Sequence, residues 1–335
     1  MKVTIIGAGS WGSALARLLA DNNHSVLLYD ISQETIDEIN QFHTNLSKLP
    51  QGTLPITVVA TTNLFQAINS SDIIVLSIPT KVIRETLIEM AKVIQSPKLF
   101  VNASKGLEPL THKRVSEIVK EEIPQDMIKG FVALTGPSHA EEVIQGLPTA
   151  ICSASESSED AKLIQTLFSN TVNFRVYTLN DLIGAELGGA LKNVYAVASG
   201  MLEGLGYGDN ARAALISRAL FEMTKLAVAL GAKEATLFGL TGLGDLVVTT
   251  SSHHSRNFQA GVKLSQGKNL EQTIQSIPMV VEGFRTTLAA YDVAKLLKID
   301  TPIIDAVYSV IYEKRDVKLA VQELMMRALK DEFVE

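Results

Sequence analysis

The chain has 335 residues, of which 46% are hydrophobic and 20% charged, so it can bury a sizeable core and is long enough for two domains. Its formal net charge of -6 excludes a general attraction to nucleic acid or anionic lipid. The single cysteine, Cys152, excludes an internal disulfide framework, and its apolar setting in TAICSA predicts a buried core residue. We predict a cytoplasmic protein without an integral membrane segment.

The first half of the chain alternates short β-branched runs with amphipathic helical patterns, which is typical of a parallel sheet wrapped by helices. We therefore predict a doubly wound, Rossmann-like α/β domain over residues 1–180. Its eight candidate strands cover 2–6, 24–30, 56–62, 72–78, 98–104, 130–136, 149–154 and 173–178.

The N-terminal stretch VTIIGAGSWGSALARLLADN carries Gly7, Gly9 and Gly12 in the G-x-G-x-x-G spacing, directly after a strand and before a helix. In this motif the first glycine permits a tight turn, the second lets a pyrophosphate approach the backbone, and the third lets helix and strand pack closely. Ser10 and Trp11 would present backbone amides at the helix start. The pattern predicts a dinucleotide-binding turn, and a purely structural glycine turn is the alternative.

Asp30 ends the second candidate strand, where an acidic side chain can accept hydrogen bonds from the adenosine ribose. A carboxylate there repels a 2′-phosphate, and the following Ile31 and Ser32 offer no arginine to hold one. The sequence therefore favours NAD over NADP as the cofactor. In the alternative interpretation, Asp30 only caps a turn.

Two further segments follow strands of the predicted sheet. Lys105, in NASKGLEP, precedes Gly106 and is expected to hold a substrate oxygen or phosphate, with a solvated loop lysine as the alternative. In TGPSHAEEV, Ser138 is expected to cap a helix whose free backbone amides bind an anion or a polar ligand.

From Asp181 onward the strand patterns stop, which predicts an all-helical second domain over residues 181–335. The predicted helices cover 181–205, 209–231, 257–266, 286–297, 303–313 and 316–331. Within this half, Ser255, Arg256 and Asn257 stand at a helix start, where such donors form a phosphate cradle. Adjacent His253 and His254 lack a carboxylate or cysteine at ligand spacing, so we predict no metal site.

The stretch AELGGALKNVYAVASG is almost free of charge, yet it contains Lys192. Helical spacing places Gly188 and Gly189 beside this lysine, so the neighbouring face is reduced to backbone. Burial would lower the pKa of Lys192 towards neutrality, which suits a proton donor and acceptor in a carbonyl/alcohol interconversion. A structural ion pair with Glu186 or Asp245 is the alternative, and Asp245 either forms a turn or orients a catalytic base.

Taken together, GAGSWGSALA, SKGLE, GPSHAEEV, ELGGALKNVYAVASG, GLTGLGDLVVTTSSHHSRN and VVEGFRT resemble the NAD(P)-dependent glycerol-3-phosphate dehydrogenases, in order and nearly end to end. The resemblance implies a Rossmann-like domain followed by a helical domain of the 6-phosphogluconate dehydrogenase C-terminal type. It also implies reduction of dihydroxyacetone phosphate to sn-glycerol 3-phosphate for phospholipid synthesis. A homodimer is the hypothesis for the assembly.

The resemblance also assigns roles to residues of this chain. Lys192 resembles the proton donor and acceptor, Lys105 its partner in holding the substrate, and Asp245 the carboxylate beside the catalytic lysine. The implied substrate contacts are Lys105, Gly136, Ser138, Lys192, Asp245, Ser255, Arg256 and Asn257. To the glycine turn and Asp30 the resemblance adds, as contacts of NAD or NADP, Lys105, Ala140, Arg256, Val280 and Glu282.

The chain departs from the family pattern in two places. Bacterial members often carry arginine or histidine after the second strand, where this chain has YDIS, and SSHH before Ser255 also differs from the common run. Two rival functions remain at this point. A related two-domain hydroxy-acid dehydrogenase or ketopantoate-type reductase would not need the phosphate cradle, and a non-catalytic NAD sensor would not need a buried lysine.

Overall fold

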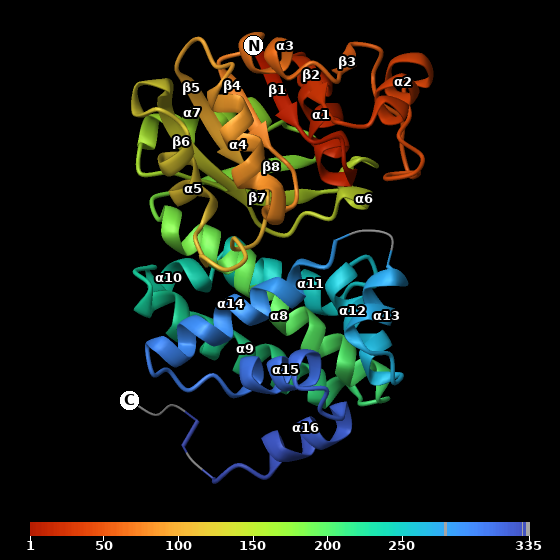
Figure 1. Ribbon diagram of the computed structural model, residues 1–335, viewed down its shortest axis with the longest axis vertical. Helices are drawn as coiled ribbons and strands as arrows, with labels where there is room; N and C mark the ends of the chain where they lie inside the picture. The colour runs from red at the N-terminus through yellow and green to blue at the C-terminus, as the bar shows by residue number, and fades with distance from the viewer. Residues whose placement is uncertain (278–279, 330, 333–335) are drawn as a thin grey trace.

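The computed structural model describes residues 1–277, 280–329, 331 and 332, and it places a sheet in one half of the molecule and a helical bundle in the other (Figure 1). The last strand ends at Leu179, and the first long helix begins at Leu182. Among the described residues, no helix combines the length and the apolar character that a membrane crossing requires.

The sheet has eight strands in the order β3-β2-β1-β4-β5-β6-β7-β8. Its direction of growth reverses between β1 and β4, which is where open α/β sheets form a ligand crevice at the carboxyl ends of the strands. All eight predicted strands are confirmed. They are β1 (Lys2–Ile6), β2 (Ser25–Tyr29), β3 (Val58–Thr61), β4 (Ile73–Leu76), β5 (Lys98–Asn102), β6 (Ile128–Thr135), β7 (Thr149–Ala154) and β8 (Phe174–Leu179).

The prediction of a parallel sheet is wrong for one pair, because β7 runs antiparallel to β6. A parallel connection needs a crossover, usually made by a helix that spans the sheet. The segment between β6 and β7 contains only the four-residue helix α6 (Ala140–Val143), so the chain reverses direction instead. The other neighbouring pairs of described strands are parallel.

Helices cover both faces of the sheet, which confirms the doubly wound arrangement. Val3 and Ile5 of β1 face a core shared with α1 and α7, whereas Ile6 faces a core shared with α3, α4 and α5. Cys152 is buried in β7, and burial raises the pKa of its thiol to about 11, as expected of a core residue. The helices of this half are α1 (Ser10–Asp21), α2 (Gln33–Phe42), α3 (Leu64–Asn69), α4 (Ile83–Ala91), α5 (Val115–Glu122) and α7 (Ser158–Phe168), with short turns η1 (Thr80–Val82) and η2 (Gln125–Met127).

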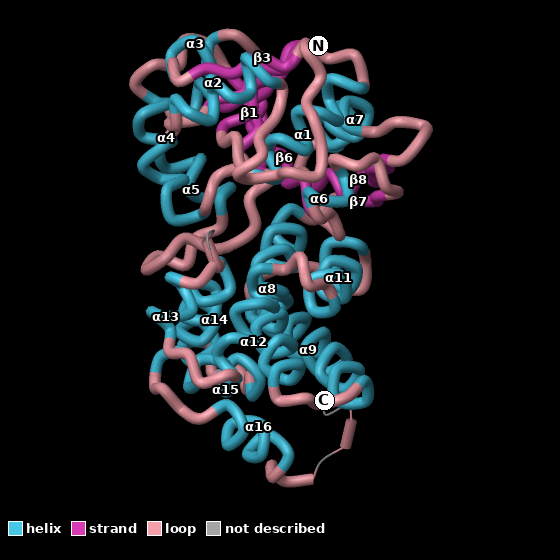
Figure 2. Tube along the Cα trace, turned by 90° about the vertical axis from the view of Figure 1, so that its right-hand side faces the viewer, coloured by secondary structure: helices cyan, strands magenta, loops and turns pink. Residues whose placement is uncertain are grey.

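Helix α8 (Leu182–Gly204) lies in the middle of the helical half (Figure 2), and every residue from 184 to 202 is buried, so no face of the helix over this length is exposed to solvent. It packs against α9, α11, α12 and α14. The other helices are α9 (Asp209–Ala229), α10 (Glu234–Leu237), α11 (Asp245–Ser251), α12 (Arg256–Ser265), α13 (Leu270–Gln275), α14 (Glu282–Leu296), α15 (Pro302–Tyr312) and α16 (Val317–Met325), with a π-turn η3 at Leu240–Gly244.

Two predictions about this half need correction. The helix predicted over 316–331 ends at Met325, and the described residues beyond it are not helical; residue 330 lies outside the described residues. Met326 and Leu329 are exposed there, so their apolar spacing has no surface on which to bury. In addition, α10, η3, α11 and α13 form in stretches for which the sequence pattern indicated no helix.

Helices α8 and α12 cross with their backbones in contact. A Cβ on Gly200 would lie 1.9 Å from the carbonyl oxygen of Phe258, and a Cβ on Gly261 would lie 2.0 Å from that of Val197. Only glycine permits this approach. The crossing therefore fixes the start of α12 relative to α8.

Replacing Gly261 by alanine should force α8 and α12 apart and lower the free energy of unfolding by about 1–3 kcal/mol, the usual effect of overpacking. Chemical denaturation of the two proteins would measure this difference. Gly208→Ala is the matched control, because a Cβ there would meet nothing within 4 Å. Equal loss of stability in both variants would contradict the conclusion that the α8–α12 crossing requires glycine at position 261.

Candidate active site

Three charged side chains meet where the two halves join. Lys105 follows β5, Lys192 lies in α8 and Asp245 begins α11. The Asp245 carboxylate pairs with both lysines: Lys192 Nζ lies 2.5 Å from Oδ1, and Lys105 Nζ lies 2.8 Å from Oδ2. Lys192 is 6% exposed and Asp245 is 1% exposed, so water screens these charges little. One buried carboxylate thus holds two ammonium groups from different halves of the molecule.

Glycines in α8 allow this arrangement. A Cβ on Gly188 would lie 2.6 Å from the carbonyl oxygen of Thr241 in η3, so the missing side chain lets η3 pack on α8. Because η3 leads directly into α11, this contact brings Asp245 to Lys192. A Cβ on Gly189 would lie 3.0 Å from Oγ1 of Thr135 at the end of β6. Close packing therefore explains the bare face that the sequence pattern revealed.

The surroundings of Lys192 favour proton exchange near neutral pH. Burial lowers the pKa of Lys192 to about 7, and the charge of Lys105 adds to this effect while Asp245 opposes it. Burial acts to raise the pKa of Asp245, but Lys105 and Lys192 outweigh it and lower that pKa. Thr249, one turn further along α11, accepts a hydrogen bond from Lys192 Nζ at 2.7 Å and donates one to the Asp245 carbonyl at 2.6 Å. The ammonium is thus fixed in direction from two sides.

The Lys105 side chain links the loops after β5 and β6. Its Nζ donates to the Gly136 carbonyl at 2.7 Å, and Ser138 Oγ donates to the same carbonyl at 2.9 Å. The prediction that Ser138 caps a helix is therefore wrong: its hydroxyl turns back to Gly136, and His139 is the N-cap residue of α6. The Lys105 side chain is 18% exposed, so it is less enclosed than that of Lys192.

The glycine turn has the shape that its sequence predicts. Gly7 has a φ of +108°, and a Cβ on Gly12 would lie 1.9 Å from the Gly7 carbonyl oxygen, so both positions require glycine. Gly9 is the N-cap of α1, has no side-chain cap, and would place a Cβ in open space. The buried Nε1 of Trp11 has no hydrogen-bond partner among the described residues. Uncapped amides, an open approach and a free donor fit a pyrophosphate-containing dinucleotide.

The Asp30 carboxylate stabilises the glycine turn by accepting hydrogen bonds from two backbone amides. Its Oδ2 accepts from the Ala8 amide at 2.9 Å, and its Oδ1 accepts from the Ser32 amide at 3.0 Å. The turn-capping role is therefore present in the structure. Because each carboxylate oxygen can accept a further bond, the predicted ribose contact stays compatible with this role. Ile31, directly after it, is 86% exposed.

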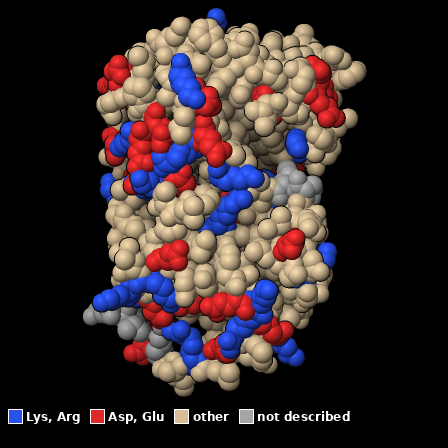
Figure 3. Space-filling view, in the orientation of Figure 1, with Lys and Arg blue, Asp and Glu red and all other residues tan. Residues whose placement is uncertain are grey.

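The start of α12 carries a positively charged side chain, that of Arg256. Ser255 Oγ accepts from the Phe258 amide at 3.2 Å, as an N-cap residue does. Arg256 is the first residue of the helix, and its guanidinium has no hydrogen-bond partner among the residues that the structure describes, although the charges of Glu141 and Glu282 act on it. Figure 3 shows mixed charges over the molecular face, with a small basic group at the level where the halves meet. Any anion site is therefore local.

Of the remaining predicted contacts, two already form hydrogen bonds within the protein, and two are apolar residues near the start of a helix. Asn257 is tied to its neighbours, because its Nδ2 donates to Asn193 Oδ1 at 2.8 Å and its Oδ1 accepts from the Gly283 amide at 2.9 Å. Glu282 accepts from the amide and hydroxyl of Thr80. Ala140 is buried at the start of α6, and half-buried Val280 precedes α14.

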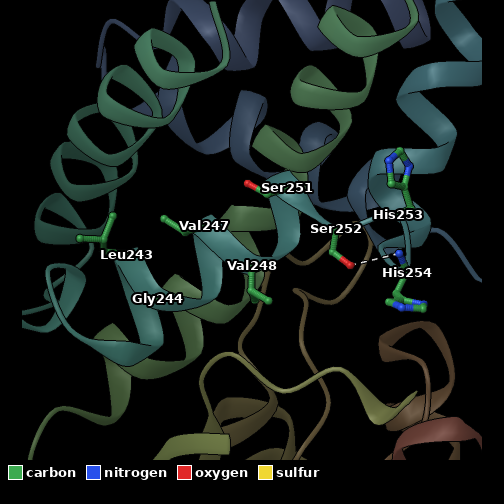
Figure 4. Close-up of a pocket in the computed structure, with 8 residues that line it drawn as sticks. All are labelled: Leu243, Gly244, Val247, Val248, Ser251, Ser252, His253 and His254. Carbon is green, nitrogen blue, oxygen red and sulfur yellow. Dashed lines mark hydrogen bonds between the residues drawn. The ribbon is translucent and has the colours of Figure 1, made fainter. Parts of the chain in front are cut away.

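A separate pocket lies on the outer side of α11 (Figure 4). Asp245 and Thr249 of this helix are buried and do not line the pocket, so the pocket is separate from the lysine cluster. The loop at its end is held by a hydrogen bond from the His254 amide to Ser252 Oγ at 3.1 Å. The lining residues are Leu243, Gly244, Val247, Val248, Ser251, Ser252, His253 and His254.

Comparison with known proteins connects this geometry to a family. Residues 2–161 match the family model for the NAD-dependent glycerol-3-phosphate dehydrogenase N-terminus, and residues 181–322 match the model for its C-terminus. The chain belongs to this family. A glycerol-3-phosphate dehydrogenase [NAD(P)+] from Bacillus thuringiensis (strain Al Hakam) is 49% identical over 331 residues, which cover 99% of this chain and 97% of the relative.

Solved glycerol-3-phosphate dehydrogenases have the same architecture. The enzyme from Coxiella burnetii is 35% identical, with a TM-score of 0.92 over 97% of this chain and 99% of that one. The glycerol-3-phosphate dehydrogenase of Saccharomyces cerevisiae is 26% identical, with a TM-score of 0.81 over 96% and 98% of the two chains. The predicted family and fold class are thus confirmed.

Within the dehydrogenase fold, the structure also decides between the two partners considered for Lys192. Asp245 is the partner, and Glu186 is not. Glu186 instead accepts from the Ser116 amide at 2.9 Å and pairs with Arg114 at 3.1 Å, which ties α8 to α5.

Sequence reasoning missed two side chains near the cluster. Thr249 contacts Lys192, and its spacing of four residues from Asp245 on a helix is the signal that would have found it. Burial, with the charges of Lys192 and Lys105, lowers the pKa of His139, whose Nε2 lies 3.4 Å from the Val248 carbonyl. His139 stands between two predicted contacts, but only the fold shows which way it turns.

Lys192 should lose its proton near pH 7 rather than near the ordinary lysine value of 10.5, because its ammonium is buried. Chemical-shift titration of the 13C-labelled lysine Cε would follow it, with Lys192→Arg to assign the signal. Asp245→Asn should lower the pKa of Lys192 further, since it removes the attraction that favours the charged form. Titration of Lys192 near pH 10.5 would contradict this description of the site.

Proposed function

We propose that this protein interconverts dihydroxyacetone phosphate and sn-glycerol 3-phosphate with NAD(P)H, and that Lys192 carries the proton. The observation that supports this assignment most directly is the buried Lys192–Asp245–Lys105 cluster at the junction of the two halves. The reaction supplies glycerol 3-phosphate for phospholipid synthesis, and we place it in the cytoplasm. Residues 1–180 and 181–335 are its two domains, a division supported by the change from strands to helices after Leu179.

The cofactor site would consist of the glycine turn, Asp30 and residues facing them from both halves. NAD(P)H, when bound, supplies the hydride that reduces the ketone carbon. The amides after Gly9 at the start of α1 would bind the pyrophosphate, and Asp30 would bind the ribose. The further contacts proposed are Lys105, Ala140, Arg256, Val280 and Glu282.

Lys192 moves the proton. In the direction of reduction, its ammonium donates a proton to the alkoxide oxygen that forms on the substrate, while the Lys105 ammonium stabilises the negative charge on that oxygen. In the direction of oxidation, neutral Lys192 accepts the hydroxyl proton. A pKa of about 7 lets both protonation states of Lys192 exist near neutral pH. Asp245 and Thr249 keep its Nζ aimed at one place.

The start of α12 would hold the substrate phosphate. Ser255, Arg256 and the free amides of the first turn provide donors of the right kind, and the helix dipole adds to the attraction. Gly136 and Ser138 lie beside Lys105, at the other end of a three-carbon substrate. Asn257 helps to fix the position of α12 through its hydrogen bonds to Asn193 and Gly283. It would also contact the substrate. Phosphate binding would orient the ketone carbon towards the cofactor.

Lys192→Ala should abolish turnover, by at least about a thousandfold, because a general acid and base is removed. NADH affinity should stay nearly unchanged, since the glycine turn and Asp30 belong to β1, α1 and β2 and not to α8. NADH oxidation with dihydroxyacetone phosphate and NADH titration by fluorescence would measure the two quantities. Near-normal turnover in the variant would remove the proposed role of Lys192.

Asp30 should set a preference for NADH over NADPH, because its carboxylate repels a 2′-phosphate. Asp30→Ala should narrow this preference, and Asp30→Asn should do so while keeping an acceptor oxygen for one of the two amides, that of Ala8 or that of Ser32. The ratio of kcat/KM with the two cofactors is the measurement. If the ratio stays the same in both variants, Asp30 does not discriminate between them.

A further inference from the structure

The loop between α2 and β3 (residues 43–57) contacts the glycine turn through the side chain of Asn45. The Nδ2 atom of Asn45 donates to the Ala8 carbonyl at 2.8 Å and to Ser13 Oγ at 2.9 Å. Asn45 is 2% exposed, so water does not compete for these hydrogen bonds. Because the Ala8 carbonyl can only accept, the side-chain atom that faces it must be the amide nitrogen. Asn45 therefore joins the loop to the residue between the first two glycines of the motif.

This loop is also held by contacts that do not involve the glycine turn. The Leu49 amide donates to the Asn45 carbonyl at 2.7 Å. The Leu54 amide donates to the His43 carbonyl, also at 2.7 Å, and so closes the loop. The Leu49 and Leu54 side chains are 2% and 5% exposed, and they pack in the core that contains the buried face of α1. The loop is thus a fixed base from which the Asn45 amide reaches the turn.

The contact decides the orientation of the peptide bond between Ala8 and Gly9. No described peptide bond is cis, and in a planar trans peptide the C=O and the N–H point in opposite directions. Because the Ala8 carbonyl points to Asn45, the Gly9 N–H points away from the loop. Gly9 has a φ of -76°, but glycine adopts positive φ about as readily, so the backbone would also permit the reversed peptide. The hydrogen bond from Asn45 selects between the two orientations.

The orientation of this peptide matters for an anion at the start of α1. Such an anion is bound by backbone N–H groups that point at it, and a carbonyl oxygen in their place would repel it. Reversal of the peptide would exchange the Gly9 N–H for the Ala8 oxygen. Asp30 cannot prevent the reversal, because it accepts from the Ala8 amide, which belongs to the preceding peptide bond. Asp30 and Asn45 thus each hold one of the two peptide bonds that flank Ala8.

We propose that Asn45 is a positioning residue for the cofactor, which holds the Ala8–Gly9 peptide so that its N–H, and not its carbonyl oxygen, is available to the pyrophosphate. This inference rests on the proposed function, because it takes the glycine turn as the pyrophosphate site. The buried Oδ1 of Asn45 has no hydrogen-bond partner among the described residues. An unpaired buried acceptor costs free energy, which offsets part of what the two donor bonds contribute to stability. Loss of Asn45 should therefore affect cofactor affinity more than stability.

The test measures binding of ADP-ribose, which carries the pyrophosphate of the cofactor but does not react, by isothermal titration calorimetry. Asn45→Leu keeps the approximate shape of the side chain and removes both donors without adding a charge. We expect the Kd for ADP-ribose to rise about tenfold, the effect of about one hydrogen bond. KM for NADH should rise similarly, with kcat changed by less than about threefold. Adenosine lacks the pyrophosphate, so its Kd, measured by NMR titration, should change by less than about twofold.

Three further variants separate this role from a structural one. Asn40→Leu is the matched control, because the Asn40 amide in α2 also binds backbone: it donates to the Ala60 carbonyl and accepts from the Ala60 amide in β3, both at 2.9 Å. Its loss should leave the Kd for ADP-ribose unchanged. Ser13→Ala should also leave it within about twofold, because the bond from Asn45 to Ala8 remains. Asn45→Ala removes the same donors as Asn45→Leu and should weaken binding equally, so it replaces that variant if leucine prevents folding.

The outcomes are distinct. If the wild-type protein binds neither ADP-ribose nor NADH, the proposed cofactor site itself fails. If the wild type binds ADP-ribose and the Asn45 variants bind it within about twofold as tightly, the role of Asn45 is wrong while the function stands. An equal loss of affinity for adenosine, or an equal loss in Asn40→Leu or Ser13→Ala, would also overturn it, since the loss would then not arise from the Ala8–Gly9 peptide. Recording the Tm of each variant shows whether it is folded during the titration.

Discussion

The carboxylate of Asp245, shared between two lysines, is the interaction on which the site depends. Two ammonium groups drawn out of water and close to one another would repel, and each would carry a large desolvation penalty without a counter-charge. Asp245 supplies that charge to both. Because Lys105 belongs to the sheet half and Lys192 to the helical half, the same ion pairs also join the halves. The same ion pairs therefore both join the two halves and set the electrostatics of the proposed site.

Close backbone contacts between helices position the charged side chains of the site. Gly188 lets the turn before α11 pack on α8, and Gly200 and Gly261 let α12 cross α8 with touching backbones. The first contact sets the position of Asp245, and the second sets the start of α12 with Ser255 and Arg256. Glycine in a helix lowers its intrinsic stability by about 1 kcal/mol relative to alanine. In α8 this local loss is balanced by tertiary packing that brings the charged groups together.

The protein is acidic overall, with a formal net charge of -6, so the anion sites that we propose are local. They are the N-termini of α1 and α12, and α12 also carries Arg256 there. Neighbouring carboxylates are engaged elsewhere: Asp30 binds two amides beside the glycine turn, and Glu282 binds Thr80. The carboxylates of these two acids therefore already accept hydrogen bonds within the protein. Attraction of an anion to these proposed sites would therefore depend on the local donors and not on the net charge of the protein.

The sequence by itself determined the eight strands, the conformation of the glycine turn and the burial of Lys192, because each follows from a local period or spacing: alternation in strands, three glycines, a helix without other charges. Only the tertiary structure decided which acid pairs with Lys192, since Asp245 lies 53 residues away, and which residue holds Glu282, since Thr80 lies 202 residues away. It also decided the antiparallel β7, the engaged amide of Asn257 and the end of α16. These features depend on what each segment meets across the fold, and no local pattern encodes the identity of a distant neighbour.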